Sequence, residues 1–222
     1  MAYYLVFMKS KHDVFIINLK DRIDRRKHCL NQFKDKTEFR VTFVDAIRHE
    51  IGAIGLWQTM REIINSADNK ELSCVIICED DHSFTDFYKY EFLESAISNI
   101  DNINGDLLLG GVSHFEDAVQ INQSCFWVNR FTGFQFAIVF KRFYKRFLAL
   151  ELGDEDNIDI QMKCISNKIF CVYPFISIQA EFGYSDVTKK NEGVGIVNRY
   201  FEQSQERLDT LFRLRSYFDD FK

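Results

Sequence analysis

The chain has 222 residues, of which 46% are hydrophobic and 15% aromatic, so disorder is excluded. It contains one proline and no linker-like stretch, which predicts a single domain over residues 1–222. The formal net charge is −5 with mixed signs along the chain, which argues against a nucleic-acid-binding protein because those need a basic face. No uncharged apolar stretch of 18 residues occurs, and residues 3–8 are too short for a signal-peptide core.

The first half alternates between strand-like and helix-like patterns. Short β-branched runs alternate with segments whose apolar residues recur at helical spacing. This alternation predicts a three-layer α/β/α domain with a mostly parallel central sheet. In chain order, we expect a strand at 14–19, a helix over 20–33, a strand at 39–44, a helix at 51–67, a strand at 74–78, a helix at 87–100 and a strand at 106–111.

The second half is less regular. An acidic loop is expected at 153–157, a polar loop at 187–195 and a charged amphipathic helix from residue 200 to 221. The elements expected before that helix are a strand at 134–140, helices at 142–150 and 159–166, and a strand at 169–173. We divide the domain into a nucleotide-binding half (13–112), an acceptor-side half (113–199) and a C-terminal helix (200–222).

Six cysteines are scattered without a CxxC pair, and the five histidines are equally dispersed. Neither a zinc site nor a disulfide framework is expected. Free, buried thiols in a reducing cytoplasm fit this pattern best, so we expect a cytoplasmic protein.

The most informative stretch is 74–84, where an apolar strand stops at three adjacent acids, Glu79, Asp80 and Asp81. Open α/β sheets bind ligands at the carboxyl ends of their strands. Adjacent carboxylates repel one another, and oxygen ligands suit Mg²⁺ or Mn²⁺. The alternative is a solvated acidic turn that caps the next helix, since Asp and Ser are good N-caps.

Several segments together resemble glycosyltransferase family 25, which includes bacterial lipooligosaccharide galactosyltransferases and collagen galactosyltransferases. The resemblance runs from about residue 14 to 186, and its strength lies in the order of the motifs rather than in any one of them. The matching segments are 16–19 with 24–26 ("INL…DRR"), 77–81 ("xLEDD"), 106–110 ("DxxxLG"), 132–136 ("TGxxAY"), 157–159 ("PID") and Pro174, Gln179, Gly183, Ser185 and Asp186 ("P…Q…SDI").

One family motif is altered. The family usually shows "GCxLSH" before the acidic segment, where this chain has residues 52–57 with Leu56 and Trp57 in place of the Ser-His pair. If that pair contacts donor or acceptor in the family, this replacement changes the substrate or the activity.

The resemblance implies a GT-A-like (Rossmann-like) fold and transfer of a hexose such as galactose from a nucleotide donor, with UDP as the expected nucleotide. It also implies Mn²⁺ or Mg²⁺ to neutralise the departing diphosphate, with Asp81 as the first-choice ligand and Glu79 as its partner. The donor-binding residues are then Asn18, Leu19, Arg25, Arg26, Asp80 and Gly111. Taken singly, either arginine could equally coat a surface helix, and Asn18 could be a turn residue.

Inverting transfer needs a base for the acceptor hydroxyl, and Asp159 matches the aspartate of "PID". The competing interpretation of Asp159 is a helix N-cap, with Asp156 and Glu181 as reserve bases. Gln179, Ser185 and Asp186 are expected to orient donor or acceptor.

The leading hypothesis is therefore a metal-dependent glycosyltransferase of bacterial surface-glycan synthesis, including lipopolysaccharide. Its partners are a nucleotide-sugar and a glycan or glycolipid acceptor. Contact with the inner face of a membrane would be peripheral, and the oligomeric state is left open. The alternative is a catalytically degenerate sugar- or nucleotide-binding relative of the same fold. A nucleotidyltransferase ranks lower, because no glycine- and basic-rich phosphate loop lies near the N-terminus.

Overall fold

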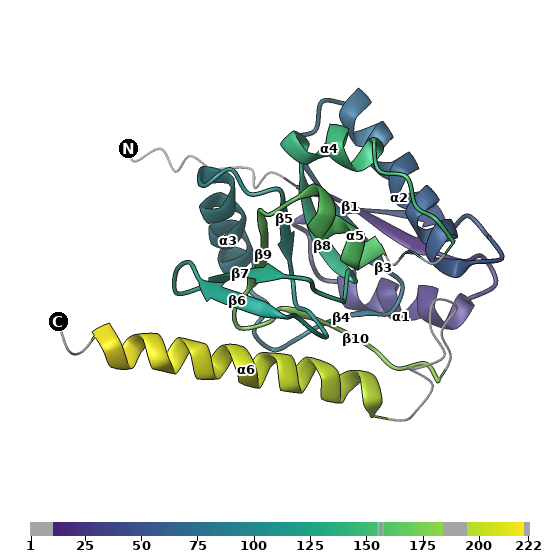
Figure 1. Cartoon of the computed structure of the whole chain (residues 1–222). Coiled ribbons are helices and arrows are strands. Elements are labelled where there is room, and N and C mark those ends of the chain that lie inside the picture. The colour runs from purple at the N-terminus through teal and green to yellow at the C-terminus, as the bar shows by residue number, and fades with distance from the viewer. Residues whose placement is uncertain (1–10, 155, 157, 184–194, 220–222) are drawn as a thin grey trace, which may run out of the picture.

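Eight strands form one mixed sheet in a computed structural model that describes residues 11–154, 156, 158–183 and 195–219 (Figure 1). The strand order is β2-β1-β3-β8-β5-β9-β7-β6. The main-sheet strands are β1 (His12–Asn18), β2 (Phe39–Asp45), β3 (Cys74–Glu79), β5 (Leu107–Leu109), β6 (Asp117–Gln120), β7 (Cys125–Asn129), β8 (Phe136–Phe140) and β9 (Ile169–Val172).

The sheet is mostly parallel in direction. β1 runs parallel to β2 and β3, and β5 runs parallel to β9. β8 is antiparallel to both β3 and β5, and β7 is antiparallel to both β9 and β6. Within the described eight-stranded sheet, therefore, only β8 and β7 oppose the common direction.

Helices cover both faces of the sheet, as the expected three-layer architecture requires. The helices are α1 (Ile23–Phe33), α2 (Gly52–Asn69), α3 (Tyr90–Asn102), α4 (Lys141–Leu148), α5 (Ile158–Ile165) and α6 (Ile196–Asp219). Side chains of α2, α4, α5 and α6 join one apolar core, whereas side chains of α1 and α3 join the other. Figure 1 shows α2 beside α4 and the long α6 along the edge of the molecule.

Strand residues alternate between these two cores. Ile77 and Val75 of β3 face one core, whereas Ile76 faces the other, and all three are 0% exposed. Burial on both faces explains why β3 is a continuous apolar run rather than an alternating one. The Rossmann-like α/β/α fold class, with its C-terminal helix, is confirmed.

Four short strands are absent from the sequence-based expectation. β4 (His82–Phe84) and β10 (Ser177–Gln179) pair only with each other, and β6 with β7 forms the exposed end of the sheet. Three- to five-residue strands carry little periodicity, which is why the pattern misses them. The expected loop at 187–195 lies, apart from Gly195, outside the described residues.

The strand order reverses at β1, because β2 and β3 lie on opposite sides of it in the sheet. The chain passes from β1 to β2 on one side and then crosses to β3 on the other side of β1. Ligands of open α/β sheets bind in the crevice at the carboxyl ends of the strands at such a switch point. In this chain that point lies between Asn18 and Glu79.

All six cysteines, each within the described residues, are free. Cys74 is half-buried and Cys164 is exposed, so burial of every thiol was wrong. No helix in the described part of the chain is both long enough and apolar enough to cross a membrane.

Candidate functional site

A cavity of about 800 Å³ lies at the switch point. Its walls come from the carboxyl end of β1, α1, the loop between β2 and α2, the acidic turn after β3, the segment before β8, and the chain around α5, β10 and the start of α6. Among the residues predicted for the site, the cavity is lined by Leu19, Arg25, Glu79, Asp80, Asp81, Asp159 and Gln179.

The three acids come together because β3 ends at Glu79. Asp80 and Asp81 form a turn that enters β4 directly, and the Asp81 carbonyl accepts the Ala180 N–H at 2.6 Å. Within the regular strand, neighbouring side chains would point to opposite faces. The alternative of a solvated helix cap is wrong here, because Asp80 is 7% exposed and α3 begins only at Tyr90.

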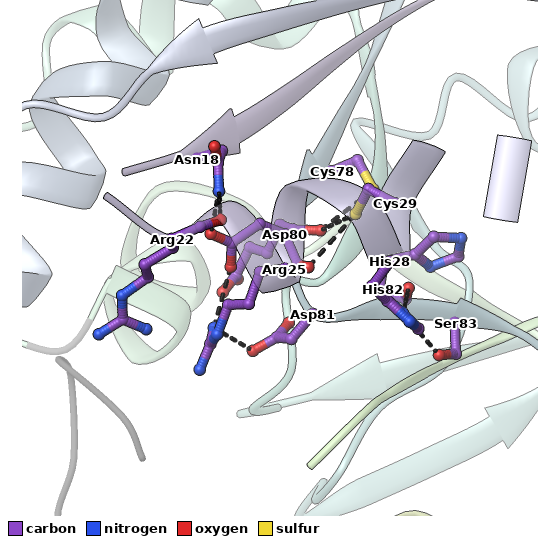
Figure 2. Close-up of polar contacts among 11 residues, drawn as sticks. Asn18, Arg22, Arg25, His28, Cys29, Cys78, Asp80, Asp81, His82 and Ser83 are labelled. Atoms are coloured by element: carbon purple, nitrogen blue, oxygen red, sulfur yellow. Dashed lines mark hydrogen bonds and ion pairs between the residues drawn. The ribbon is translucent and has the colours of Figure 1, made fainter. Parts of the chain in front are cut away.

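Arg25 of α1 reaches across to the acidic turn (Figure 2). Its Nη1 lies 2.9 Å from Asp80 Oδ1 and 3.2 Å from Asp81 Oδ2. The Asn18 amide donates to Asp80 Oδ2 at 2.8 Å, and the Cys29 thiol donates to the Asp80 carbonyl at 3.3 Å. Buried charges require such pairing. Arg25 and Asp80 thus form part of the site's framework, whatever ligand contact they also make.

The ionised forms of Glu79 and Asp81 are unfavourable in this environment. Burial, and to a smaller extent Asp80, raises the pKa of Asp81 to about 6, although Arg25 opposes the shift. Burial followed by the charges of Asp81 and Asp159 raises the pKa of Glu79. Asp81 Oδ1 is buried without a hydrogen-bond partner. A bound cation would offset these features, since a nearby positive charge favours the ionised form of a carboxyl.

The chemistry of Glu79 and Asp81 would suit a divalent cation. No three His, Cys, Asp or Glu side chains are arranged to hold a metal ion in the part of the chain that the structure describes. Mg²⁺ sites commonly use one or two carboxylates and complete their coordination with water and substrate phosphate. Two carboxylates, one with an unpartnered buried oxygen, match that kind of site.

Asp159, in the first turn of α5, lines the same cavity as the acidic turn. Its Oδ2 accepts the Gly133 N–H at 2.9 Å. Gly133 has φ +105°, and a Cβ there would come within 2.9 Å of the Ser113 nitrogen, so only glycine fits this contact. Burial raises the pKa of Asp159 to about 6. The carboxyl is therefore fixed in place and poised to accept a proton near neutral pH.

The two reserve bases have structural partners. Glu181 accepts backbone N–H groups of Gly195, Val197 and Asn198, which lowers the pKa of Glu181 and caps the start of α6. Asp156 accepts the Gly153 N–H at 2.7 Å and the Gln161 side chain at 2.6 Å. Both line the cavity, but each already accepts hydrogen bonds that hold the local backbone or a neighbouring side chain in place.

Three predicted donor residues lie outside the cavity lining. Asn18 sits behind Asp80, and Arg26 stacks over the Phe43 ring at 4.0 Å. Gly111 is packed beneath the chain leading into β10. Ser185 and Asp186 lie outside the described residues, and so does Tyr184.

Gly111 is required by a close backbone approach. A Cβ at this position would lie 2.1 Å from the Ser177 carbonyl oxygen. We therefore expect Gly111→Ala to lower the free energy of unfolding by about 1–3 kcal/mol, measured by urea denaturation. Gly153→Ala is the control, because its Cβ would meet nothing closer than 3.4 Å. An unchanged Gly111→Ala stability would contradict this packing role.

The loop between β2 and α2 is a cavity wall that sequence reasoning missed. The Ile47 N–H donates to Thr59 Oγ1 at 2.9 Å, and a Cβ on Gly55 would lie 2.3 Å from the Ile47 carbonyl. The only available signal was the glycine inside the α2 pattern. Leu56, at the altered family motif, lines the cavity, whereas Trp57 is buried in the core.

The likeness to solved structures is distant. The apo structure of UDP-glucose pyrophosphorylase aligns with a TM-score of 0.46 and 9% identity, over 86% of this chain and 82% of that one. The same enzyme complexed with UDP-glucose gives 0.46 and 10%, over 86% and 81%. No protein-family model and no curated protein sequence matches this chain.

Proposed function

We propose that this protein is a metal-assisted glycosyltransferase that moves a hexose from a nucleotide-sugar to a saccharide acceptor. The observation that carries the proposal is the convergence of Glu79, Asp81 and Asp159 on one cavity at the sheet's switch point. A pair of carboxylates in the acidic turn and a separately held carboxyl on α5 suit two different tasks. The family resemblance of the sequence motifs agrees with this assignment.

The two tasks follow from the charges. In an inverting displacement the acceptor oxygen forms a bond to the anomeric carbon, while the bond from that carbon to the diphosphate oxygen breaks and its electron pair leaves with the diphosphate. The acceptor proton passes to the Asp159 carboxylate, whose fixed position and raised pKa suit a general base. Glu79 and Asp81 would hold a divalent cation, which supplies charge stabilisation to the leaving diphosphate. Arg25 keeps Asp81 oriented.

The test first measures the affinity of the protein for UDP in the presence of Mn²⁺ or of EDTA. It then measures hydrolysis of UDP-, GDP- and CMP-linked sugars. We expect Mn²⁺ to strengthen UDP binding, and Asp81→Asn to weaken it at least about tenfold, equivalent to about 1.4 kcal/mol. Asp86→Asn is the control, since Asp86 is an exposed acid a few residues further on. Absence of nucleotide binding by the wild type with metal would overturn the proposal.

One observation favours a second candidate, the degenerate binding relative. Arg25 already neutralises part of the acidic turn, as a built-in cation would. A protein of that kind would bind UDP equally in Mn²⁺ and EDTA and would release no sugar from any donor. The same screen therefore separates the two candidates.

A further inference from the structure

A second cavity of about 400 Å³ lies next to the first, on the side of α6. Ser113, Thr132 and Tyr200 line both cavities, so the two adjoin one another. The remaining lining residues of the second cavity are His114, Gln203, Ser204 and Arg207. Its size is that of a small-ligand site, which usually spans about 300–1,000 Å³.

The junction between the cavities lies beside the proposed base. Thr132 precedes Gly133, whose N–H is bound by Asp159. A saccharide with a hydroxyl at Asp159 would therefore extend naturally past Thr132 and Tyr200 into the second cavity. Tyr200 lines both cavities and is 42% exposed, so its aromatic ring is accessible to a sugar.

The second cavity has rigid walls. Ser204 Oγ donates to the Ser113 carbonyl at 2.8 Å, and Ser113 Oγ lies 3.0 Å from Thr132 Oγ1. Arg207 donates to the carbonyls of Phe115 at 2.6 Å and Glu116 at 3.0 Å, and its guanidinium carbon lies 4.0 Å from the Phe115 ring centroid. These contacts fix α6 against the loop that follows β5.

The charge of Arg207 is not balanced by its contacts. Its hydrogen bonds go to backbone carbonyls, and no carboxylate of the described residues forms an ion pair with it. Glu116, the nearest acid in sequence on that loop, pairs with Arg130 through its side chain instead. A fixed guanidinium of this kind matches the geometry of a carboxylate or phosphate.

We propose that the second cavity is a subsite for the acceptor and that it takes an anionic saccharide, with the acidic group at Arg207. This inference rests on the proposed function for the position of the reacting hydroxyl. The polar side chains and Tyr200 contact the sugar, and Arg207 selects its negative charge over a neutral analogue.

The experiment measures binding of methyl β-glucuronide, glucose 6-phosphate and methyl β-glucoside to the protein in the presence of UDP and Mn²⁺. Ligand-observed NMR titration gives each Kd. We expect at least one anionic sugar to bind about tenfold or more tightly than the neutral one, and the two anionic probes distinguish a carboxylate from a phosphate. Arg207→Gln should abolish this preference, and Arg207→Lys should keep only part of it, because an ammonium retains the charge but not the guanidinium fork that holds Arg207 in place.

Arg213→Gln is the matched control on the same helix, because Arg213 is exposed and lines neither cavity. It should leave every Kd unchanged. Equal binding of charged and neutral sugars by the wild type, binding of none of them, or a preference that survives Arg207→Gln would each overturn the subsite. If the wild type did not bind UDP, the proposed function itself would be refuted. UDP binding is measured in the same samples.

Discussion

Asp159→Asn is expected to lower the turnover number of sugar transfer by about 10²–10⁴-fold, the usual contribution of a general base. The variant keeps the shape of the side chain, and its amide oxygen can still accept the Gly133 N–H that Asp159 accepts at 2.9 Å. UDP affinity should therefore stay within about twofold. In the wild type, kcat/KM should rise with pH and level off above about pH 6, because burial raises the pKa of Asp159 to about 6.

The same variant should be more stable than the wild type. A carboxyl whose pKa rises from 3.8 to about 6 on folding binds its proton more tightly in the folded state. Stability is therefore lost as pH rises between these two values, and the full penalty applies above pH 6. Full conversion of the shift would give about 3 kcal/mol. Asp159 is only half-buried, so solvent screening reduces the expected gain to about 1–2 kcal/mol.

Urea denaturation at pH 4 and pH 8 checks the sign, since the gain from Asp159→Asn should be small at pH 4 and largest at pH 8. Asp156→Asn is the comparison, because Asp156 lines the same cavity but holds Gly153 and Gln161. If Asp156→Asn removed turnover and Asp159→Asn did not, the base assignment would be wrong.

The sequence pattern was sufficient for the longer elements of the first half of the fold, although it missed β4. Long, periodic elements such as α2 and the apolar run of β3 follow directly from residue spacing. The direction of β8 was not predictable. Its five residues are all buried, so its hydrophobic pattern is the same whether the strand runs parallel or antiparallel to its neighbours. β4 and β10 exist only through their mutual pairing, which no local signal encodes.

The candidate site shows the same division. The acids at 79–81 were recognisable because a strand end dictates where they lie. The partners of those acids were not, since Arg25 and Asp80 are 55 positions apart and meet only in the folded chain. Glu181 was considered as a base for its residue type alone, whereas its contacts with the start of α6 decide its role.

Arg25→Gln should be the most destabilising of the substitutions considered, lowering the free energy of unfolding by about 3–5 kcal/mol. The side chain of Arg25 is 8% exposed and bridges Asp80 and Asp81, which are 10% and 14% exposed. Removing one partner of a buried ion pair leaves the other charge uncompensated, which accounts for a loss of this size. Arg26→Gln is the control, because the adjacent Arg26 is exposed and only stacks on Phe43.

The loss of stability in Arg25→Gln should depend on pH and on metal, and this dependence tests whether the acidic turn binds a cation. Arg25 holds down the pKa of Asp81, so without it the Asp81 pKa rises above about 6 and the carboxyl is protonated at pH 5. The loss measured by urea denaturation should therefore be smaller at pH 5 than at pH 8. If Glu79 and Asp81 bind a cation, millimolar Mn²⁺ should restore part of the stability at pH 8, because an ion that binds only the folded state stabilises it. A loss that is equal at both pH values and unaffected by Mn²⁺ would mean that Arg25 contributes packing alone, and the acidic turn would then lose its assignment as a metal site.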